Sequence, residues 1–482
     1  MSGGPISPAI GAPRMPFVAQ LGLLMGPFLS MVDSNVVNVA LAPIAQSLHG
    51  SLHDTQWIVS GYLLALSAAL AASAYLSKRF STMRVYRVSL VGFLIGSILC
   101  ALSPTLPLLI AARVFQGAFG ALLIPLAMTM ILGSGGRVAS GEMSPLLGLV
   151  LFMAPAIGPS LGGLLIPLGG WPLIFLINVP FGIFGLIAGS RIKGRVADAS
   201  DRSVRFDPLG IALLSLGVVG ITYGATNGPT DGWLSLSSAP FWAAGAVLIF
   251  LYVVLRKDRP HPAVNLSLLR SPFTAAAVGI ATLTSVVNFA MVVLVPLFMQ
   301  SLQRASALTA GLALIPQALM SGVGTAVSNR VTRRLGTRAT TVVGMLLLTA
   351  GTLFLLLMEL DTPAWITACI LVARSFAIGL VVQPLIQVAV GRVTPAQTAD
   401  ANTLFMITNR IGGAVGIAIL VTLFQVRSQA LARVHGVAGA VTGFHETVLI
   451  LTGLAAAGLV LAFFTLREKT AAPVDQLVDE TP

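Results

Sequence analysis

The sequence predicts an all-α polytopic membrane protein. Of its 482 residues, 56% are apolar and 9% are charged, whereas about 25% of the residues of a soluble globular protein carry a charge. The apolar residues gather in fourteen runs, most of them near the ~20 residues that a helix needs to cross a bilayer. Such runs are helical because, in lipid, every backbone polar group must be satisfied within the segment. The pattern excludes a soluble domain, a disordered chain and a barrel of alternating strands.

The fourteen expected spans form two blocks of six with a pair between them. The first block covers 17–47, 55–77, 86–104, 106–131, 144–167 and 171–190, the pair covers 208–226 and 239–255, and the second block covers 273–299, 307–329, 339–358, 363–390, 402–425 and 446–466. The expected domains are a tail (1–16), an N-terminal six-helix bundle (17–192), a linker with two extra helices (193–271), a C-terminal six-helix bundle (272–467) and a second tail (468–482). The first run is too long for a cleaved signal peptide, so we expect it to remain as a span.

The basic residues predict the orientation of these spans. With the N-terminus inside, 22 of the 28 Lys and Arg residues fall in inward loops and tails, and three (Arg304, Arg427 and Arg433) fall in outward loops. Cytoplasmic loops of membrane proteins carry such an excess. We therefore expect a multi-pass protein of the cytoplasmic (inner) membrane with both termini in the cytoplasm. The net charge of +12 then reflects topology, and no nucleic-acid partner is expected.

The two six-span blocks share a short internal repeat. Arg113, in Ala-Arg-Val-Phe, and Arg374, in Ala-Arg-Ser-Phe, both lie in the fourth span of their block. The loop after the second span is basic in both blocks, with Lys78-Arg79 in one and Arg333-Arg334 in the other. Bundles related by a parallel repeat hold a substrate site near the middle of the membrane, between the two halves.

Asp33 is the acidic residue that lies clearly inside an expected span. A helix that enters the membrane near Phe17 carries Asp33 about 24 Å along its axis, at 1.5 Å per residue, into the outer half of the membrane. A carboxylate within the membrane is costly and marks a functional site by default. Burial favours the neutral form of a carboxyl group, so this residue is a candidate for binding and releasing a proton. The alternative is a structural carboxylate that is hydrogen-bonded to a neighbouring helix.

Three arginines also lie within expected spans: Arg113, Arg374 and Arg410. A buried arginine keeps its charge and needs acceptors. Arg113 either tunes a nearby carboxylate or braces backbone carbonyl groups, and the bracing role is favoured for Arg374 and Arg410.

Other motifs do not support an enzyme or a metalloprotein. Gly158-x-Ser160-x-Gly162 resembles a serine-hydrolase elbow only formally, because that motif needs a strand, a turn and a helix. His49 and His53 lack a full set of metal ligands, and no phosphate-binding Gly-rich string with Lys occurs. Cys100 and Cys369 lie in apolar runs and are expected to be small buried side chains. We expect no cofactor, and either an ion gradient or the substrate's own gradient as the energy source.

Polar or soft side chains on several spans are candidates for lining a central cavity. They are Asn38, Tyr62, Gln116, Met153, Asn288, Met291, Gln317, Gln383, Phe405 and Asn409. Met and aromatic side chains accommodate lipophilic ligands of varied shape. Ordinary helix packing explains most of these residues equally well.

Five segments share one further feature: 33–41, Leu109-x-x-x-Arg113-x-x-Gln116-Gly117, Gly158-Pro159-x-x-Gly162-Gly163, 171–180 and 409–416. Together they resemble the major facilitator superfamily, and in particular its 14-span drug:proton antiporters. In that family they resemble, in order, the helix-one signature, motif B, antiporter motif C, the entry of helix six, and helix eleven. The resemblance covers nearly the whole chain.

This resemblance implies a major facilitator fold and a proton-driven exporter of small lipophilic or cationic drugs that works by alternating access. Asp33 is then the proton-responsive carboxylate, Arg113 its electrostatic partner, and the stretch from Gly158 to Gly163 a packing hinge. The expected partners are the substrate, protons and membrane lipids, and the chain is expected to be a monomer. A lipid or metabolite exporter on the same fold is the alternative, and a membrane enzyme or a receptor is less favoured.

One departure concerns motif A, in the loop after the second span. The family has an Asp where this chain has Lys78, and glycines where it has Ala74 and Ser81; the matching loop of the second block has Arg333. In the family this Asp is associated with a charged contact that holds the outward-open state. Its replacement by a base puts the usual latch in question.

Overall fold

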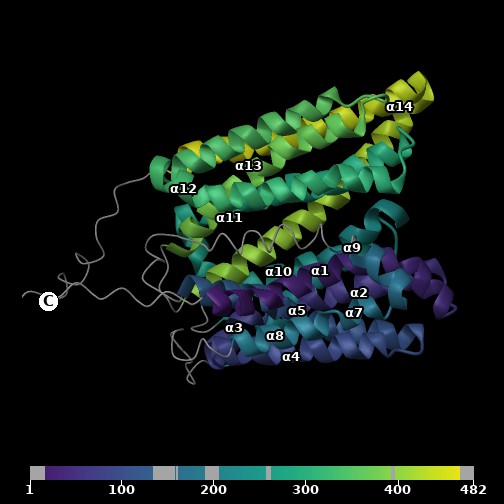
Figure 1. Ribbon diagram of the computed structural model, residues 1–482. Coiled ribbons are helices and arrows are strands. Elements are labelled where there is room, and N and C mark those ends of the chain that lie inside the picture. The colour runs from purple at the N-terminus through teal and green to yellow at the C-terminus, as the bar shows by residue number, and fades with distance from the viewer. Residues whose placement is uncertain are drawn as a thin grey trace, which may run out of the picture.

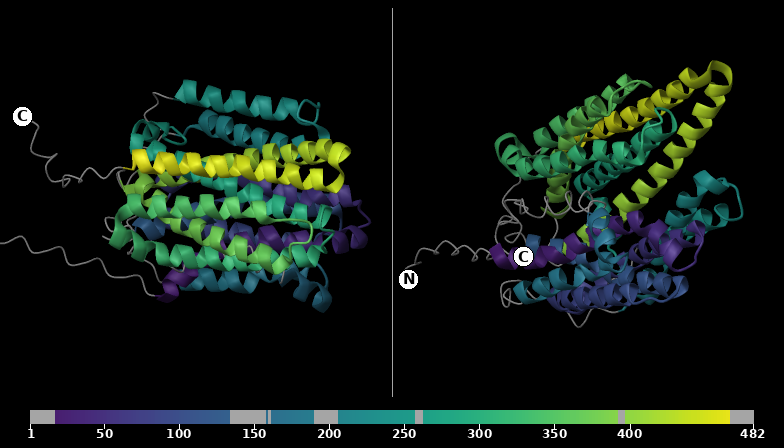
Figure 2. Two further views of the ribbon diagram at one scale, coloured as in Figure 1. Left: turned by 90° about the horizontal axis from the view of Figure 1, so that it is seen from above. Right: turned by 45° about the vertical axis from the view of Figure 1, so that its right-hand side comes forward.

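The computed structural model describes residues 17–133, 158, 161–189, 206–256, 262–391 and 397–466, and these ranges are helical without strands. The helices form two bundles that lie one above the other in Figure 1, and the right view of Figure 2 shows the upper bundle tilted relative to the lower one. The predicted all-α, multi-pass class is confirmed.

The N-terminal bundle is built from helices that follow the predicted spans. They are α1 (Phe17–Ser47), α2 (Leu52–Leu70), α3 (Ser73–Arg79), α4 (Thr82–Ala101), α5 (Leu106–Gly133), α7 (Leu173–Leu176) and α8 (Asn178–Gly189). Residues 161–169 are also helical. The axes of α2 and α3 differ by 49°, and together the two helices are long and apolar enough for one bent span. Ser51 caps α2 by accepting a hydrogen bond from the backbone N–H of Asp54 at 3.0 Å.

A helical hairpin, α9 (Pro208–Asp231) and α10 (Ala239–Arg256), lies between the two halves of the sequence. Asp207 caps α9 and also pairs with Arg256 at the end of α10, at 3.4 Å. The hairpin contacts both bundles, because Ser215 of α9 donates to the carbonyl of Ala68 and the indole N–H of Trp233 donates to Thr422.

The C-terminal bundle contains two helices that are interrupted by a glycine. Its elements are η3 (Leu266–Arg270), α11 (Pro272–Ser301), α12 (Ala307–Leu353), η4 (Phe354–Leu357), α13 (Ala364–Gly391) and α14 (Thr398–Thr465). Gly336 in α12 has φ 81° and Gly436 in α14 has φ 63°. These left-handed conformations favour glycine, and they divide α12 and α14 into two arms each. Both breaks lie between spans that were predicted separately.

The described residues contain fewer candidate spans than the fourteen predicted. Among the described residues, nine helices are long and apolar enough to cross a membrane, or ten when α2 and α3 count as one span, and α12 and α14 each count once. Most of the predicted span 144–167 lies outside the described residues. The count of fourteen therefore remains a prediction.

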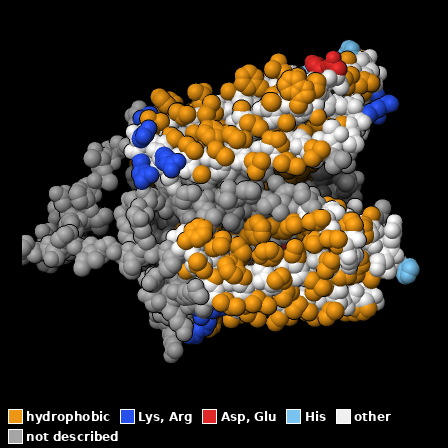
Figure 3. Space-filling model, in the orientation of Figure 1, with side chains coloured by type: hydrophobic (Ala, Val, Ile, Leu, Met, Phe, Trp, Pro, Cys, Tyr) orange, Lys and Arg blue, Asp and Glu red, His pale blue; other side chains and the backbone are white. Residues whose placement is uncertain are grey.

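The surface suits a lipid environment. Apolar side chains cover both bundles on the face shown in Figure 3, and basic side chains gather at its left end. Within α10, Phe250 and Val254 are exposed, as expected for side chains that meet lipid. Cys100 is buried, but Cys369 is exposed on α13. The expectation for Cys369 is therefore wrong, because an apolar run in a membrane protein has a lipid-facing side as well as a buried one.

Candidate functional site

Asp33 lies in a buried polar network within the N-terminal bundle. Arg113 Nη1 donates to Asp33 Oδ2 at 2.5 Å, and both side chains are 0% exposed. The other carboxylate oxygen, Oδ1, accepts from Asn178 Nδ2 at 2.9 Å and from Gln116 Nε2 at 3.2 Å. Helices α1, α5 and α8 thus meet at one carboxylate, through hydrogen bonds of the charge-assisted kind.

Gln116 and Ser97 form a second layer around this carboxylate. Gln116 Oε1 accepts from Arg113 Nη1 at 2.6 Å, which fixes the orientation of its amide. Ser97 Oγ, on α4, accepts from Gln116 Nε2 at 2.7 Å and from Asn178 Nδ2 at 3.1 Å. The network therefore joins α1, α4, α5 and α8, and a change in the charge of Asp33 alters the hydrogen bonds of each of these helices.

The Arg113 guanidinium has neutral contacts as well. Its Nε donates to the carbonyl of Ile58 at 3.2 Å, and its Cζ lies 4.0 Å from the centre of the Tyr62 ring. A cation over an aromatic face gains further stabilisation when it is desolvated. Arg113 Nη2 and Asn178 Oδ1 have no hydrogen-bond partner within the described residues. A buried polar atom without a partner costs free energy, so the network has unused capacity for another arrangement.

Local sequence explains how α5 reaches this position. Arg113 and Gln116 are three residues apart, so they share one face of the helix. Two glycines allow close approach: a Cβ on Gly117 would lie 2.5 Å from the carbonyl oxygen of Tyr62, and a Cβ on Gly96 would lie 2.8 Å from Gln116 Cα. Any larger residue would push α5 away from α2 or α4.

Two glycines of the predicted packing motif contact α1 beside Asp33. A Cβ on Gly158 would lie 2.8 Å from Asn35 Cβ and 3.1 Å from the carbonyl oxygen of Val32, and one on Gly162 would lie 3.2 Å from the carbonyl oxygen of Val36. A Cβ on Gly163 would meet nothing within 4 Å. Pro159 lies outside the described residues. The close contact therefore belongs to Gly158 and Gly162.

The candidate cavity residues have different locations. Tyr62 and Gln116 belong to the buried network around Asp33. Asn409 Oδ1 accepts from Ser285 Oγ at 2.6 Å, which joins α14 to α11. In the other cases, Met291, Gln383 and Phe405 are buried, Asn288 and Gln317 are half-buried, Asn38 is exposed, and Met153 lies outside the described residues. Among the nine candidates that the structure describes, Tyr62 and Gln116 are the two next to Asp33.

The two halves of the repeat differ chemically. Arg374, the counterpart of Arg113, is fully buried and donates to the carbonyl of Val287 at 2.6 Å. Within the described part of the chain, no carboxylate pairs with it. Arg410 donates to Ser67 Oγ at 3.1 Å, from one bundle to the other. The bracing of a backbone carbonyl that was favoured for both arginines agrees with the contact of Arg374, whereas Arg410 contacts a side-chain hydroxyl.

Three polar residues of these networks were not singled out from the sequence: Ser97, Asn178 and Asp400. Asp400 is 1% exposed and forms an ion pair with Lys78 of the other bundle. The predicted span begins at 402, so a start two residues earlier would have included Asp400. Asn178 lies in the segment that resembles the helix-six entry, where it received no role. Nothing in the sequence distinguishes Ser97 from other small residues.

Comparisons with known proteins agree with this architecture. The family model of the Major Facilitator Superfamily matches residues 23–417. The tetracenomycin C resistance and export protein of Streptomyces glaucescens is 32% identical over 434 residues, which cover 88% of this chain and 79% of that protein. The methylenomycin A resistance protein of Bacillus subtilis is 31% identical over 401 residues, covering 82% and 85%.

A solved structure shows the same fold. The crystal structure of the human organic anion transporter MFSD10 (TETRAN) aligns with a TM-score of 0.59, covering 92% of this chain and 100% of that one, at 14% identity. At this identity the likeness concerns the arrangement of helices alone.

Proposed function

This chain belongs to the Major Facilitator Superfamily, and on that premise we propose that it is a proton-driven antiporter exporting small lipophilic or cationic compounds. It is a multi-pass membrane transporter rather than an enzyme. The names of its relatives, which describe resistance and export, support export of drug-like molecules. The proposal includes fourteen spans, a place in the cytoplasmic membrane with both termini inside, a monomeric state and no cofactor.

The buried pair of Asp33 and Arg113 is the observation that carries the coupling to protons. A charge pair without water is stabilised mainly by its own attraction and hydrogen bonds. Protonation of Asp33 removes the negative charge of its carboxylate. The Arg113 guanidinium then has no counter-charge and needs other hydrogen-bond acceptors. Because the same network holds α1 against α4, α5 and α8, this change of partners alters how α1 packs.

Contacts between the bundles support alternating access as the way in which this change reaches the substrate. Ser73 and Thr403 are hydrogen-bonded at 2.8 Å, Asn402 donates to Thr129 at 3.3 Å, and Lys78 pairs with Asp400. In the proposed orientation these contacts lie at the cytoplasmic ends of the helices. The described arrangement is then the one closed toward the cytoplasm, and protonation of Asp33 would prepare its reopening.

Replacement of the carboxylate tests the proposal. Purified protein in proteoliposomes is given an imposed pH gradient, and transport of ethidium, a lipophilic cation, is followed by fluorescence. We expect Asp33→Asn to lower gradient-driven transport by about tenfold or more, a typical size for coupling between two sites.

Asp361→Asn is the matched control, because Asp361 is exposed and should transport like the wild type. Undiminished gradient-driven transport by the Asp33→Asn protein would overturn the assignment of Asp33.

A further inference from the structure

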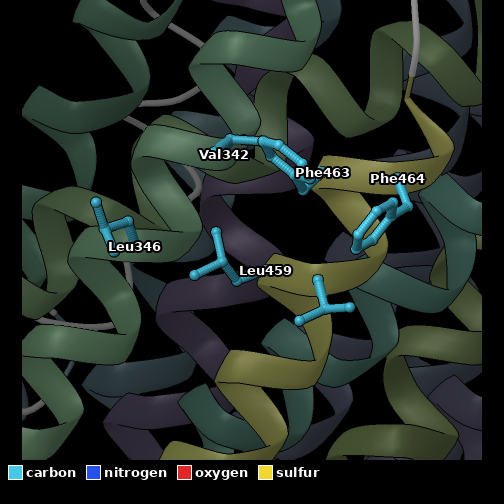
Figure 4. A pocket seen from close by; sticks show the side chains of 6 residues that line it. Val342, Leu346, Leu459, Phe463 and Phe464 are labelled. Atoms are coloured by element: carbon cyan, nitrogen blue, oxygen red, sulfur yellow. The ribbon is translucent and has the colours of Figure 1, made fainter.

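A groove on the outer surface of the C-terminal bundle lies far from the Asp33 network. Figure 4 shows it between the second arms of α12 and α14. Its volume is about 290 Å³, and its lining is apolar: Val342, Leu346, Leu459, Val460, Phe463 and Phe464. Several of these side chains are exposed; Phe464, for example, is 61% exposed. The groove therefore opens toward the lipid and not toward the interior of the protein.

One end of the groove is basic. Arg338 lies one helical turn before Val342, with its guanidinium 4.9 Å from the centre of the Phe463 ring. Arg338 Nε and Nη2 donate to the carbonyl oxygen of Phe463 at 3.1 and 2.7 Å. These contacts hold the side chain at the end of the groove. A planar guanidinium fixed in this way is preorganised to bind a phosphate group.

Further positive charge surrounds this end. Arg330 and Arg334 are exposed on the first arm of α12, just before the break at Gly336. Within the described residues, neither they nor Arg338 pair with a carboxylate. Figure 3 shows basic side chains gathered at the left end of the upper bundle, next to its apolar surface. An anionic group is therefore attracted to the place where the apolar groove begins.

We propose that this groove binds an anionic phospholipid, with the phosphate at Arg338 and an acyl chain along the apolar lining. From Arg338 to Leu346 the helix rises about 12 Å, at 1.5 Å per residue, so the groove leads from the helix end into the hydrocarbon layer. Clustered basic residues beside a membrane attract anionic lipids, whereas a cationic substrate would be repelled. Placing this lipid site in the cytoplasmic leaflet rests on the orientation proposed above. The proposal that the groove binds the lipid does not depend on that orientation.

Lipid binding to the full-length protein in detergent tests the inference. Dioleoylphosphatidylglycerol or dioleoylphosphatidylcholine is added at equal concentration, and native mass spectrometry measures the lipid-bound fraction. We expect the anionic lipid to bind about tenfold more tightly, the effect of one charge-assisted contact. Arg338→Gln should reduce its binding to the level of the zwitterionic lipid, and Leu346→Trp should reduce it by filling the groove.

Two matched variants serve as controls. Arg433→Gln removes an exposed arginine elsewhere on α14, and Leu347→Trp adds the same bulk at an exposed neighbour that does not line the groove. Both should bind the anionic lipid like the wild type. Equal binding of the two lipids, or wild-type binding by Arg338→Gln and Leu346→Trp, would overturn the proposal. Because no pH gradient is used, the outcome is independent of the Asp33 experiment.

Discussion

At the scale of single residues, each buried carboxylate of the described ranges, on Asp33, Asp207 and Asp400, lies beside a cation. Asp33 accepts from Arg113, Gln116 and Asn178, so little of its hydrogen-bonding capacity is left unused. A buried ion pair contributes little net stability, but removing one partner leaves the other charge without compensation. Replacing either Asp33 or Arg113 alone should therefore destabilise the protein, whereas replacing both together should cost much less stability.

This sensitivity gives a prediction for stability. Arg113→Gln should lower the free energy of unfolding by about 3–5 kcal/mol, because the Asp33 carboxylate loses its cation. Asp33→Asn combined with Arg113→Gln should recover most of that loss, since two amides can hydrogen-bond without a net charge. Unfolding of the purified proteins in detergent measures both effects, with Arg304→Gln, at an exposed loop arginine, as a neutral control. If the double variant instead lost the sum of the two single-variant losses in unfolding free energy, Asp33 and Arg113 would not be coupled.

At the scale of helices, glycine decides which faces approach closely. Helices in a membrane associate through close packing of small residues, and Gly158 and Gly162 bring their segment against α1 next to Asp33. Gly336 and Gly436 act differently, because their left-handed conformations end one helical arm and start the next. Glycine thus has two uses in this chain: within a span it lets two helices pack closely, and between two spans it lets the chain reverse direction.

Two glycines of the same motif make the contact testable. Gly158→Leu should destabilise the protein by about 1–3 kcal/mol through overpacking and should reduce transport, because the added side chain meets α1 at Asn35 and Val32. Gly163→Leu should change stability by no more than about 0.5 kcal/mol, since a Cβ there meets nothing within 4 Å. Thermal unfolding and ethidium transport measure both. Equal effects of the two substitutions would show that the contact with α1 is unimportant.

At the scale of the whole molecule, polar contacts at one end join the two bundles. Lys78 occupies the motif position where related transporters carry an Asp, and its partner Asp400 supplies the opposite charge from the other bundle. The altered loop thus forms an ion pair to the other bundle through Lys78 itself. The hairpin of α9 and α10 adds contacts to both bundles, so it belongs to the packed structure.

A charge exchange tests whether this ion pair holds the bundles together. Ser73→Cys and Thr403→Cys, in a background without the native cysteines, should form a disulfide on oxidation, because the two hydroxyl oxygens lie 2.8 Å apart. Lys78→Asp should lower the cross-linking yield severalfold through repulsion of Asp400. Adding Asp400→Lys should restore it, and Arg79→Asp, at the adjacent residue, should have little effect. An equal disulfide yield in all of these charge variants would show that the ion pair does not hold the bundles together.

The sequence by itself determined the helical class and most spans, and it singled out Asp33 as a candidate. These features depend on local properties: a run long enough to cross lipid must be helical, because its backbone has no other partners there. A single acid within such a run is conspicuous for the same reason. Both glycine breaks also fall where hydropathy separates two spans. The motifs further indicated the superfamily to which the chain belongs.

Only the tertiary structure decided which polar groups meet. Asn178 reaches Asp33 across 145 residues of sequence, and Lys78 reaches Asp400 across 322. Hydropathy does not predict such pairs, because a span that contacts lipid on one side and protein on the other is apolar on both. Without an amphipathic pattern, the rotation of each helix is set by its contacts with neighbouring helices, and these exist only once the bundles have packed.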